Sequence, residues 1–157
     1  MTKADLLALA LDDFLAISSE VEAAAVVSAD GLPMASALPP NVEEDRLAAM
    51  SAALLTLGER AASELGKGEL AQVFIEGPKG HVILMAAGPD SVLVAVTARG
   101  AKVGLVLFEM RRIAERVGAV MTAGVSDTLH TPAGLAVVGE EPPAPAEASA
   151  TPVASWH

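Results

Sequence analysis

The stretch 41-NVEEDRLAAMSAALLTLGERAASEL-65 decides the fold, because its pattern predicts one long helix around which the other elements must pack. Asn41 is a candidate N-cap, and Glu44 stands where the second member of a capping box belongs. Gly66 supplies the left-handed residue that commonly ends a helix. Five apolar residues recur at alternating spacings of three and four and form a seam along this helix: Leu47, Met50, Leu54, Leu57 and Ala61.

The flanks of this seam are also apolar, through a second set made mostly of small residues: Ala48, Ala49, Ala52, Ala53, Leu55 and Ala62. A helix that is apolar nearly all round is generally covered on two sides. In a chain this short, we expect one of the two covers to be another molecule. The sequence does not say which arc of the helix faces the chain's own sheet.

The composition is that of one acidic globular domain. The chain has 157 residues, of which 52% are hydrophobic and 19% charged, so it can bury a proper core. Its net charge of −10 disfavours binding to nucleic acid or anionic lipid. The absence of cysteine excludes disulfides and thiolate chemistry. No apolar run reaches the roughly 18 residues of a membrane span, and no signal segment opens the chain. We therefore expect a cytoplasmic protein without membrane insertion.

The other elements follow from periodicity and turn residues. An Asp30-Gly31 pair between two apolar runs predicts a hairpin, and Thr2 with Asp5 resembles a capping box. The runs 81–87 and 91–98 are almost wholly apolar, which predicts strands buried on both faces. The predicted order is a helix at 2–17, strands at 21–28 and 32–38, the helix at 41–65, strands at 70–76, 81–87 and 91–98, and a helix at 101–121.

This order predicts an α+β domain, αββαβββα, with a five-stranded antiparallel sheet that carries helices on both faces. The predicted domain covers residues 1–121. Residues 122–139 are an extension of uncertain structure. Residues 140–157 are rich in alanine and proline, and we expect them to be a disordered tail.

The sequence resembles the roadblock/dynein light chain family, and within it the bacterial gliding-motility regulators of Ras-like GTPases. The stretches that carry the resemblance are AAAVVSADGLPMAS (23–36), LAAMSAALLTLGERAASEL (47–65), HVILMAAG (81–88), SVLVAVTA (91–98) and GLVLFEMRRIAERV (104–117). The resemblance implies a profilin-like fold and a homodimer in which the central helix and the third strand meet their copies. It also implies an adaptor or GTPase regulator that acts through surfaces rather than catalytic side chains.

No motif of the sequence predicts catalysis, a metal site or a cofactor. Gly66-Lys67-Gly68 follows a helix and lacks the hydroxyl residue of a phosphate-binding loop, so a helix terminus is the better interpretation. His81, His130 and His157 lie far apart, with no metal-ligand spacing between them. We therefore expect a protein that is not an enzyme and binds neither metal nor cofactor.

Two surfaces are candidate partner sites. The first comprises the central helix and the third strand: Leu47, Ala49, Met50, Ala53, Leu54, Leu57, Ala61, Ala71, Val73 and Ile75. Self-association is the favoured interpretation, and a helix buried within one monomer is the alternative. The second surface comprises Arg111, Arg112 and Arg116, which could receive an acidic partner or supply an arginine to a nucleotide's phosphates. The favoured interpretation there is a solvated face balanced by Glu109 and Glu115.

The sequence thus predicts a non-catalytic homodimer that scaffolds or regulates a small Ras-like GTPase. Two alternatives belong to other classes of protein. One is a structural subunit of a cytoskeletal or motor-like assembly. The other is a small-ligand-sensing domain, although the predicted core holds no polar cluster suited to orient a ligand.

Overall fold

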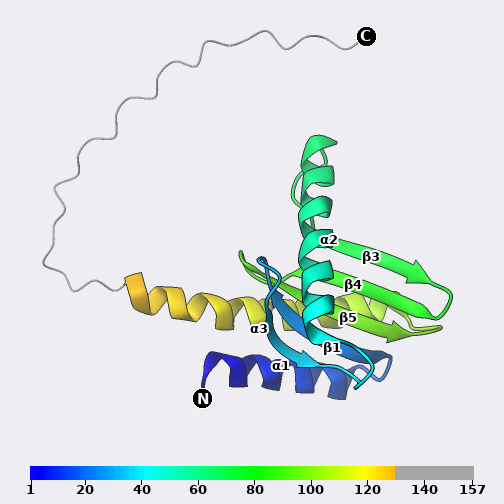
Figure 1. Ribbon diagram of the computed structural model, residues 1–157, viewed down its shortest axis with the longest axis horizontal. Helices are drawn as coiled ribbons and strands as arrows, with labels where there is room; N and C mark the ends of the chain where they lie inside the picture. Colours follow the sequence, from blue (N-terminus) through cyan, green and yellow to red (C-terminus); the bar gives the residue numbers. More distant parts are fainter. Residues whose placement is uncertain (130–157) are drawn as a thin grey trace, which may run out of the picture.

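The computed structural model describes residues 1–129 of the chain, and the side chains of residues 1–123 (Figure 1). Its elements are α1 (Lys3–Ile17), β1 (Val21–Ser28), β2 (Pro33–Ala37), α2 (Glu44–Glu64), β3 (Gln72–Gly77), β4 (Gly80–Ala86), β5 (Ser91–Ala98) and α3 (Val103–Leu129). The five strands form one antiparallel sheet in the order β2-β1-β5-β4-β3, which leaves β2 and β3 at the edges. The predicted α+β class and the order αββαβββα are confirmed.

Helices cover both faces of the sheet, as Figure 1 shows: α1 and α3 lie on one face and α2 lies on the other. Each face has its own core. Phe14, Leu93 and Met110 belong to the core under α1 and α3. Leu55 and Val94 belong to the core under α2. Because successive residues of β5 enter opposite cores, the strand is apolar almost throughout, as the sequence predicted. Burial of each Val or Leu side chain stabilises the folded state by about 1.5–3 kcal/mol.

The start of α1 is capped as the sequence predicted. The Thr2 backbone N–H donates to Asp5 Oδ2 at 3.0 Å, and the Asp5 N–H donates to Thr2 Oγ1 at 3.2 Å. The hydrogen bond from the Thr2 backbone N–H, together with a smaller contribution from the Thr2 side chain, favours the charged carboxylate and lowers the pKa of Asp5. The capping box therefore fixes where the chain enters the first helix.

The start of α2 differs from the prediction. Asn41 is not the N-cap and Glu44 forms no capping box; the helix begins at Glu44, and its cap residue, Glu43, makes no side-chain cap hydrogen bond. The reason is a turn before the helix, in which the Val42 N–H donates to the Pro39 carbonyl at 3.0 Å and encloses Asn41. Glu44 and Asp45 occupy the first helical turn, where the dipole favours them.

The end of α2 is as predicted, whereas α3 runs further than predicted. Gly66 adopts φ +68°, and the Lys67 N–H donates to the Ala62 carbonyl at 2.8 Å, which together end α2 as a Schellman motif does. The last helix, α3, continues to Leu129 rather than ending near residue 121, and no proline interrupts the sequence before residue 132. The tail predicted at 140–157 lies outside the described residues and stays a prediction.

Gly80 in the β3–β4 turn offers a test of this architecture. Its φ is +145°, and a Cβ atom there would lie 2.0 Å from the Thr97 carbonyl oxygen. Gly80→Ala is therefore expected to lower the free energy of unfolding by at least about 2 kcal/mol, measured by urea denaturation.

Gly104→Ala is the matched control, because a Cβ there meets nothing within 4 Å and Gly104 lies in the first turn of α3. This substitution should raise the free energy of unfolding by about 0.5–1 kcal/mol, since alanine favours helices over glycine. Equal stabilities of Gly80→Ala and wild type would contradict the described β3–β4 turn.

Candidate partner interface

Only the first half of α2 is held by the chain's own core. The helix has 21 residues, which corresponds to a length of about 31 Å. Its buried residues are Ala48, Ser51, Ala52 and Leu55, and none of the described residues 56–64 is buried. Figure 1 shows why: the C-terminal half of α2 extends past the edge strand β3, beyond the chain's own sheet. The second half of the helix is therefore only partly covered by the described chain.

The predicted seam lies beside the buried face of α2: Leu47 and Leu54 pack against the core under α2, and the other three seam residues are exposed. Met50 is 51% exposed and Leu57 is 61% exposed. Leu47 and Leu54 are half-buried, and Ala61 is exposed. The residues that face the sheet are Ala48, Ser51, Ala52 and Leu55, and all but Ser51 belong to the predicted flanks. No charged residue occurs between Leu47 and Gly58, so the exposed surface of this stretch is uncharged. We call Leu47, Met50, Leu54, Leu57 and Ala61 the α2 seam.

The seam adjoins the start of β3. A Cβ atom at Gly58 would lie 2.9 Å from Leu70 Cδ2 and 3.1 Å from Val73 Cγ2, so the helix crosses this end of the strand closely. Ala53 belongs to the exposed outer arc of α2. Ala49 lies elsewhere, because its Cα is 3.5 Å from the position of a Cβ on Gly31 in the β1–β2 turn. The predicted interface residues of α2 thus spread over more than one side of the helix.

The third strand, β3, is an edge strand that pairs only with β4 among the described residues. Its other side therefore presents unpaired backbone groups, which form a template for a further strand. Ile75 is 39% exposed, Val73 is half-buried and Ala71 is exposed just before the strand. Phe74 is 41% exposed and points to the opposite face, with its ring centroid 5.1 Å from that of His81. The sequence analysis missed Phe74, although a lone aromatic on an edge strand was the signal.

An apolar hollow remains on the α2 face of the sheet, toward the β3–β4 turn. Ile75 pairs with Val82, and Val82 pairs with Val96, so the three side chains form one row across β3, β4 and β5. The hollow over this row has a volume of about 410 Å³, and Glu22 and Lys79 also line it. We call Ile75, Val82 and Val96 the apolar row. The chain's own α2 leaves it uncovered.

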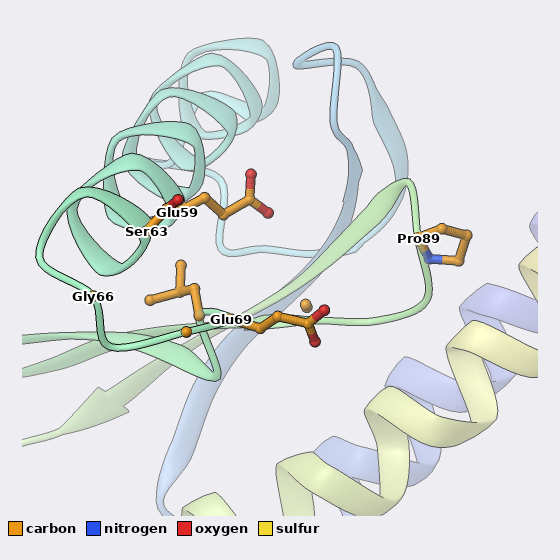
Figure 2. Close-up of a pocket in the computed structure, with 8 residues that line it drawn as sticks. Glu59, Ser63, Gly66, Glu69 and Pro89 are labelled. Atoms are coloured by element: carbon orange, nitrogen blue, oxygen red, sulfur yellow. The ribbon is translucent and has the colours of Figure 1, made fainter. Parts of the chain in front are cut away.

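A groove lies on the other side of α2. It has a volume of about 720 Å³ and is lined by Glu59, Ser63, Gly66, Gly68, Glu69, Leu70, Ala86 and Pro89. Figure 2 shows the side chains of Glu59 and Glu69 extending from two different elements toward Pro89. Glu59 follows Met50 by nine residues, as Ser63 follows Leu54, and nine residues are two and a half helical turns. The groove therefore lies on the side of α2 opposite the seam.

The predicted arginine surface belongs to the other face of the molecule. Arg116 pairs with Asp13, so it ties α3 to α1 rather than being balanced by Glu109 and Glu115 as expected. The reason is that α1 packs against α3 and brings Asp13 within reach. Arg111 and Arg112 are exposed on α3. The sheet separates these arginines from the α2 seam, so they are not part of the same surface.

The described residues contain no group of three or more His, Asp or Glu side chains that could hold a metal ion. His81 lies at the start of β4, where its Nδ1 is 3.2 Å from Thr97 Oγ1, so its ring has an ordinary hydrogen-bonding role. None of the helices within residues 1–129 is both long and apolar enough to cross a membrane.

Residues 7–97 match the family described as "Roadblock/LC7 domain", so the chain belongs to the Roadblock/LC7 family. It is 37% identical over 100 residues to the uncharacterized protein MJ1340 of Methanocaldococcus jannaschii, a match that covers 64% of this chain and 87% of the relative.

Two solved structures resemble this fold. Myxococcus xanthus MglB gives a TM-score of 0.72 at 18% identity, covering 78% of this chain and 92% of that chain. Schizosaccharomyces pombe profilin gives a TM-score of 0.53 at 17% identity, covering 75% of this chain and 97% of that chain. These likenesses confirm the roadblock and profilin-like fold.

Two neighbouring leucines of α2 test which arc is the inner one. Leu55 is 7% exposed and Leu57 is 61% exposed. Leu55→Ala is expected to lower the free energy of unfolding by about 2–5 kcal/mol through the lost contacts and the cavity. Leu57→Ala should lower it by less than about 0.5 kcal/mol in monomeric protein. The comparison is made by urea unfolding of both variants, at protein concentrations where sedimentation finds monomers. Equal losses in the free energy of unfolding would place Leu57 in the core.

Proposed function

We propose that the chain is a non-catalytic homodimeric adaptor that scaffolds or regulates a small Ras-like GTPase. The observation that carries the proposal is an exposed, uncharged seam on α2 beside an unpaired edge strand. Monomeric proteins rarely leave such apolar surface and an open strand edge uncovered. Membership of the Roadblock/LC7 family supports the same class of function.

A dimer with its two-fold axis through the middle of β3 would cover the open edge of β3, the apolar row and the α2 seam together. It pairs β3 with its copy in antiparallel fashion and so continues the sheet across the dimer. The rotation exchanges the two ends of β3. Because α2 crosses the end near Val73 and the apolar row lies toward the other end, the second copy's α2 then passes over Ile75. The overhanging half of each helix thus covers the apolar row of the other subunit.

The same rotation places the two α2 helices side by side and antiparallel. The seam residues of one helix then meet those of the other, with Ala61 allowing the backbones to approach closely. Two helix contacts and one strand pair are within reach of a standard interface of about 1,600 Å² in total. Such an arrangement converts the unpaired half of α2 into an intermolecular core.

The GTPase as partner follows from the resemblance of the sequence to bacterial regulators of Ras-like GTPases. The chain carries no phosphate-binding loop of its own, so nucleotide chemistry would belong to the partner. A rigid two-fold platform acts on such a partner by binding one of its conformations more tightly than another and thereby shifting their populations. The structural likeness to Myxococcus xanthus MglB is consistent with this role at the level of the fold.

The dimer is tested by placing a charge on the outer arc of α2. Single Asp substitutions at Ala53 and Leu57 bury a carboxylate at the contact, which costs several kcal/mol and does so twice in a two-fold dimer. At least one variant is expected to sediment as a folded monomer, with wild-type circular dichroism.

Ala8→Asp is the matched control, because Ala8 is an exposed alanine on α1, on the opposite face of the sheet. This variant should remain dimeric. A wild-type protein that sediments as a monomer at high micromolar concentration would refute the dimer.

Catalysis is tested with purified protein and GTP. We expect neither GTP binding nor GTP hydrolysis by the chain alone, because no nucleophile, metal cluster or phosphate loop occurs in its sequence. Isothermal calorimetry and phosphate release measure the two activities. Phosphate release that rises in proportion to the concentration of this protein would overturn the adaptor function.

A native pull-down that returns a filament component instead of a GTPase would favour the structural alternative.

A further inference from the structure

The groove on the far side of α2 stays open in the proposed dimer. Its walls are Glu59 and Ser63 on α2, Glu69 on the connection to β3, and Pro89 on the β4–β5 turn (Figure 2). A second, smaller hollow of about 90 Å³ lies under the middle of α2 and shares Glu59, Ala86 and Pro89 with it. The two hollows therefore adjoin each other on the flank of α2 that lies opposite the seam.

The groove is negatively charged and uncompensated. Neither Glu59 nor Glu69 makes an ion pair or a hydrogen bond with any side chain of the described residues. Lys67 lies between two lining glycines in sequence, but it does not line the groove and pairs with neither carboxylate. The last turn of α2 holds no basic residue, so no cation there offsets the negative end of the helix dipole.

The groove also has apolar walls, to which Leu70, Ala86 and Pro89 contribute. An aliphatic stem that ends in a positive charge fits this combination, because it can lie along the apolar surface while its head reaches the carboxylates. A metal ion fits poorly, since two exposed carboxylates offer too few oxygen ligands. The chemistry of the groove is that of a receptor for an arginine or lysine side chain.

We infer that this groove is the docking site of the partner protein, which inserts an arginine or lysine side chain between Glu59 and Glu69. The inference rests on the proposed function in taking the docked protein to be the GTPase rather than a second copy. One helix then carries two interfaces, the seam for self-association and the groove for the partner. A negatively charged groove also accelerates encounter with a basic surface of the partner.

The test uses the full chain and a matched pair of short peptides, acetyl-Leu-Arg-Leu-amide and acetyl-Leu-Gln-Leu-amide. Amide chemical shifts in NMR spectra are followed during titration. The arginine peptide is expected to shift the signals of Ser63, Gly66, Gly68 and Leu70, and to bind at least about tenfold more tightly than the glutamine peptide. The double substitution Glu59→Gln with Glu69→Gln should abolish this preference.

Glu64→Gln is the control, because Glu64 lies on the same helix, pairs with Arg60 and does not line the groove. It should leave the arginine preference unchanged. Equal affinities for the two peptides, shifts spread over all acidic surfaces, or an unchanged preference in the double variant would each overturn the inference. Sedimentation of the wild-type protein separates the two proposals: a wild-type dimer that does not prefer the arginine peptide refutes the groove alone, and a wild-type monomer that prefers it refutes the dimer alone.

Discussion

Both faces of the sheet are apolar and must be covered for the fold to be stable. On the face where α2 lies alone, one helix does not cover the whole sheet. On one face α1 and α3 meet this need together, and the Asp13–Arg116 ion pair and the hydrogen bond from the Lys102 N–H to Glu20 Oε2 at 2.7 Å hold them in place. On the other face α2 buries only its first half, and the apolar row stays open. Because the face under α2 is covered incompletely within one chain, a second molecule can complete it.

Periodicity in the sequence predicted the order and type of every element, because long apolar runs and turn residues are local signals. The two-sided burial of β5 was also predictable from its unbroken apolar character. The start of α2 was not predictable in this way. The turn that precedes it depends on a hydrogen bond from the Val42 N–H to the Pro39 carbonyl, which residue propensities do not reveal. The end of α3 was missed because a change in composition after residue 121 does not by itself break a helix.

The orientation of α2 was unpredictable for a different reason. Two stripes of the helix are apolar, and hydrophobicity alone assigns the larger residues to the inside. The structure does otherwise: apart from Leu55, the side chains that are buried against the sheet are small (Ala48, Ser51 and Ala52), and Met50 and Leu57 are exposed. Small residues face inward because the backbone passes close to the sheet and its turns, as the approach of Ala49 to Gly31 shows. Glu59 and Glu69 were missed because only the turn at Gly66 and Gly68 brings them to the same groove.

Placing two interfaces on one helix has a thermodynamic consequence. In the proposed arrangement the overhanging half of α2, from Thr56 to Glu64, packs against the second copy, and this half also carries Glu59 and Ser63. A partner that binds the groove therefore gains affinity when the helix is already held by self-association. By reciprocity, groove binding must strengthen the dimer by the same factor. Self-association and partner binding are then coupled through the second half of α2. A variant that weakens either contact should therefore weaken the other.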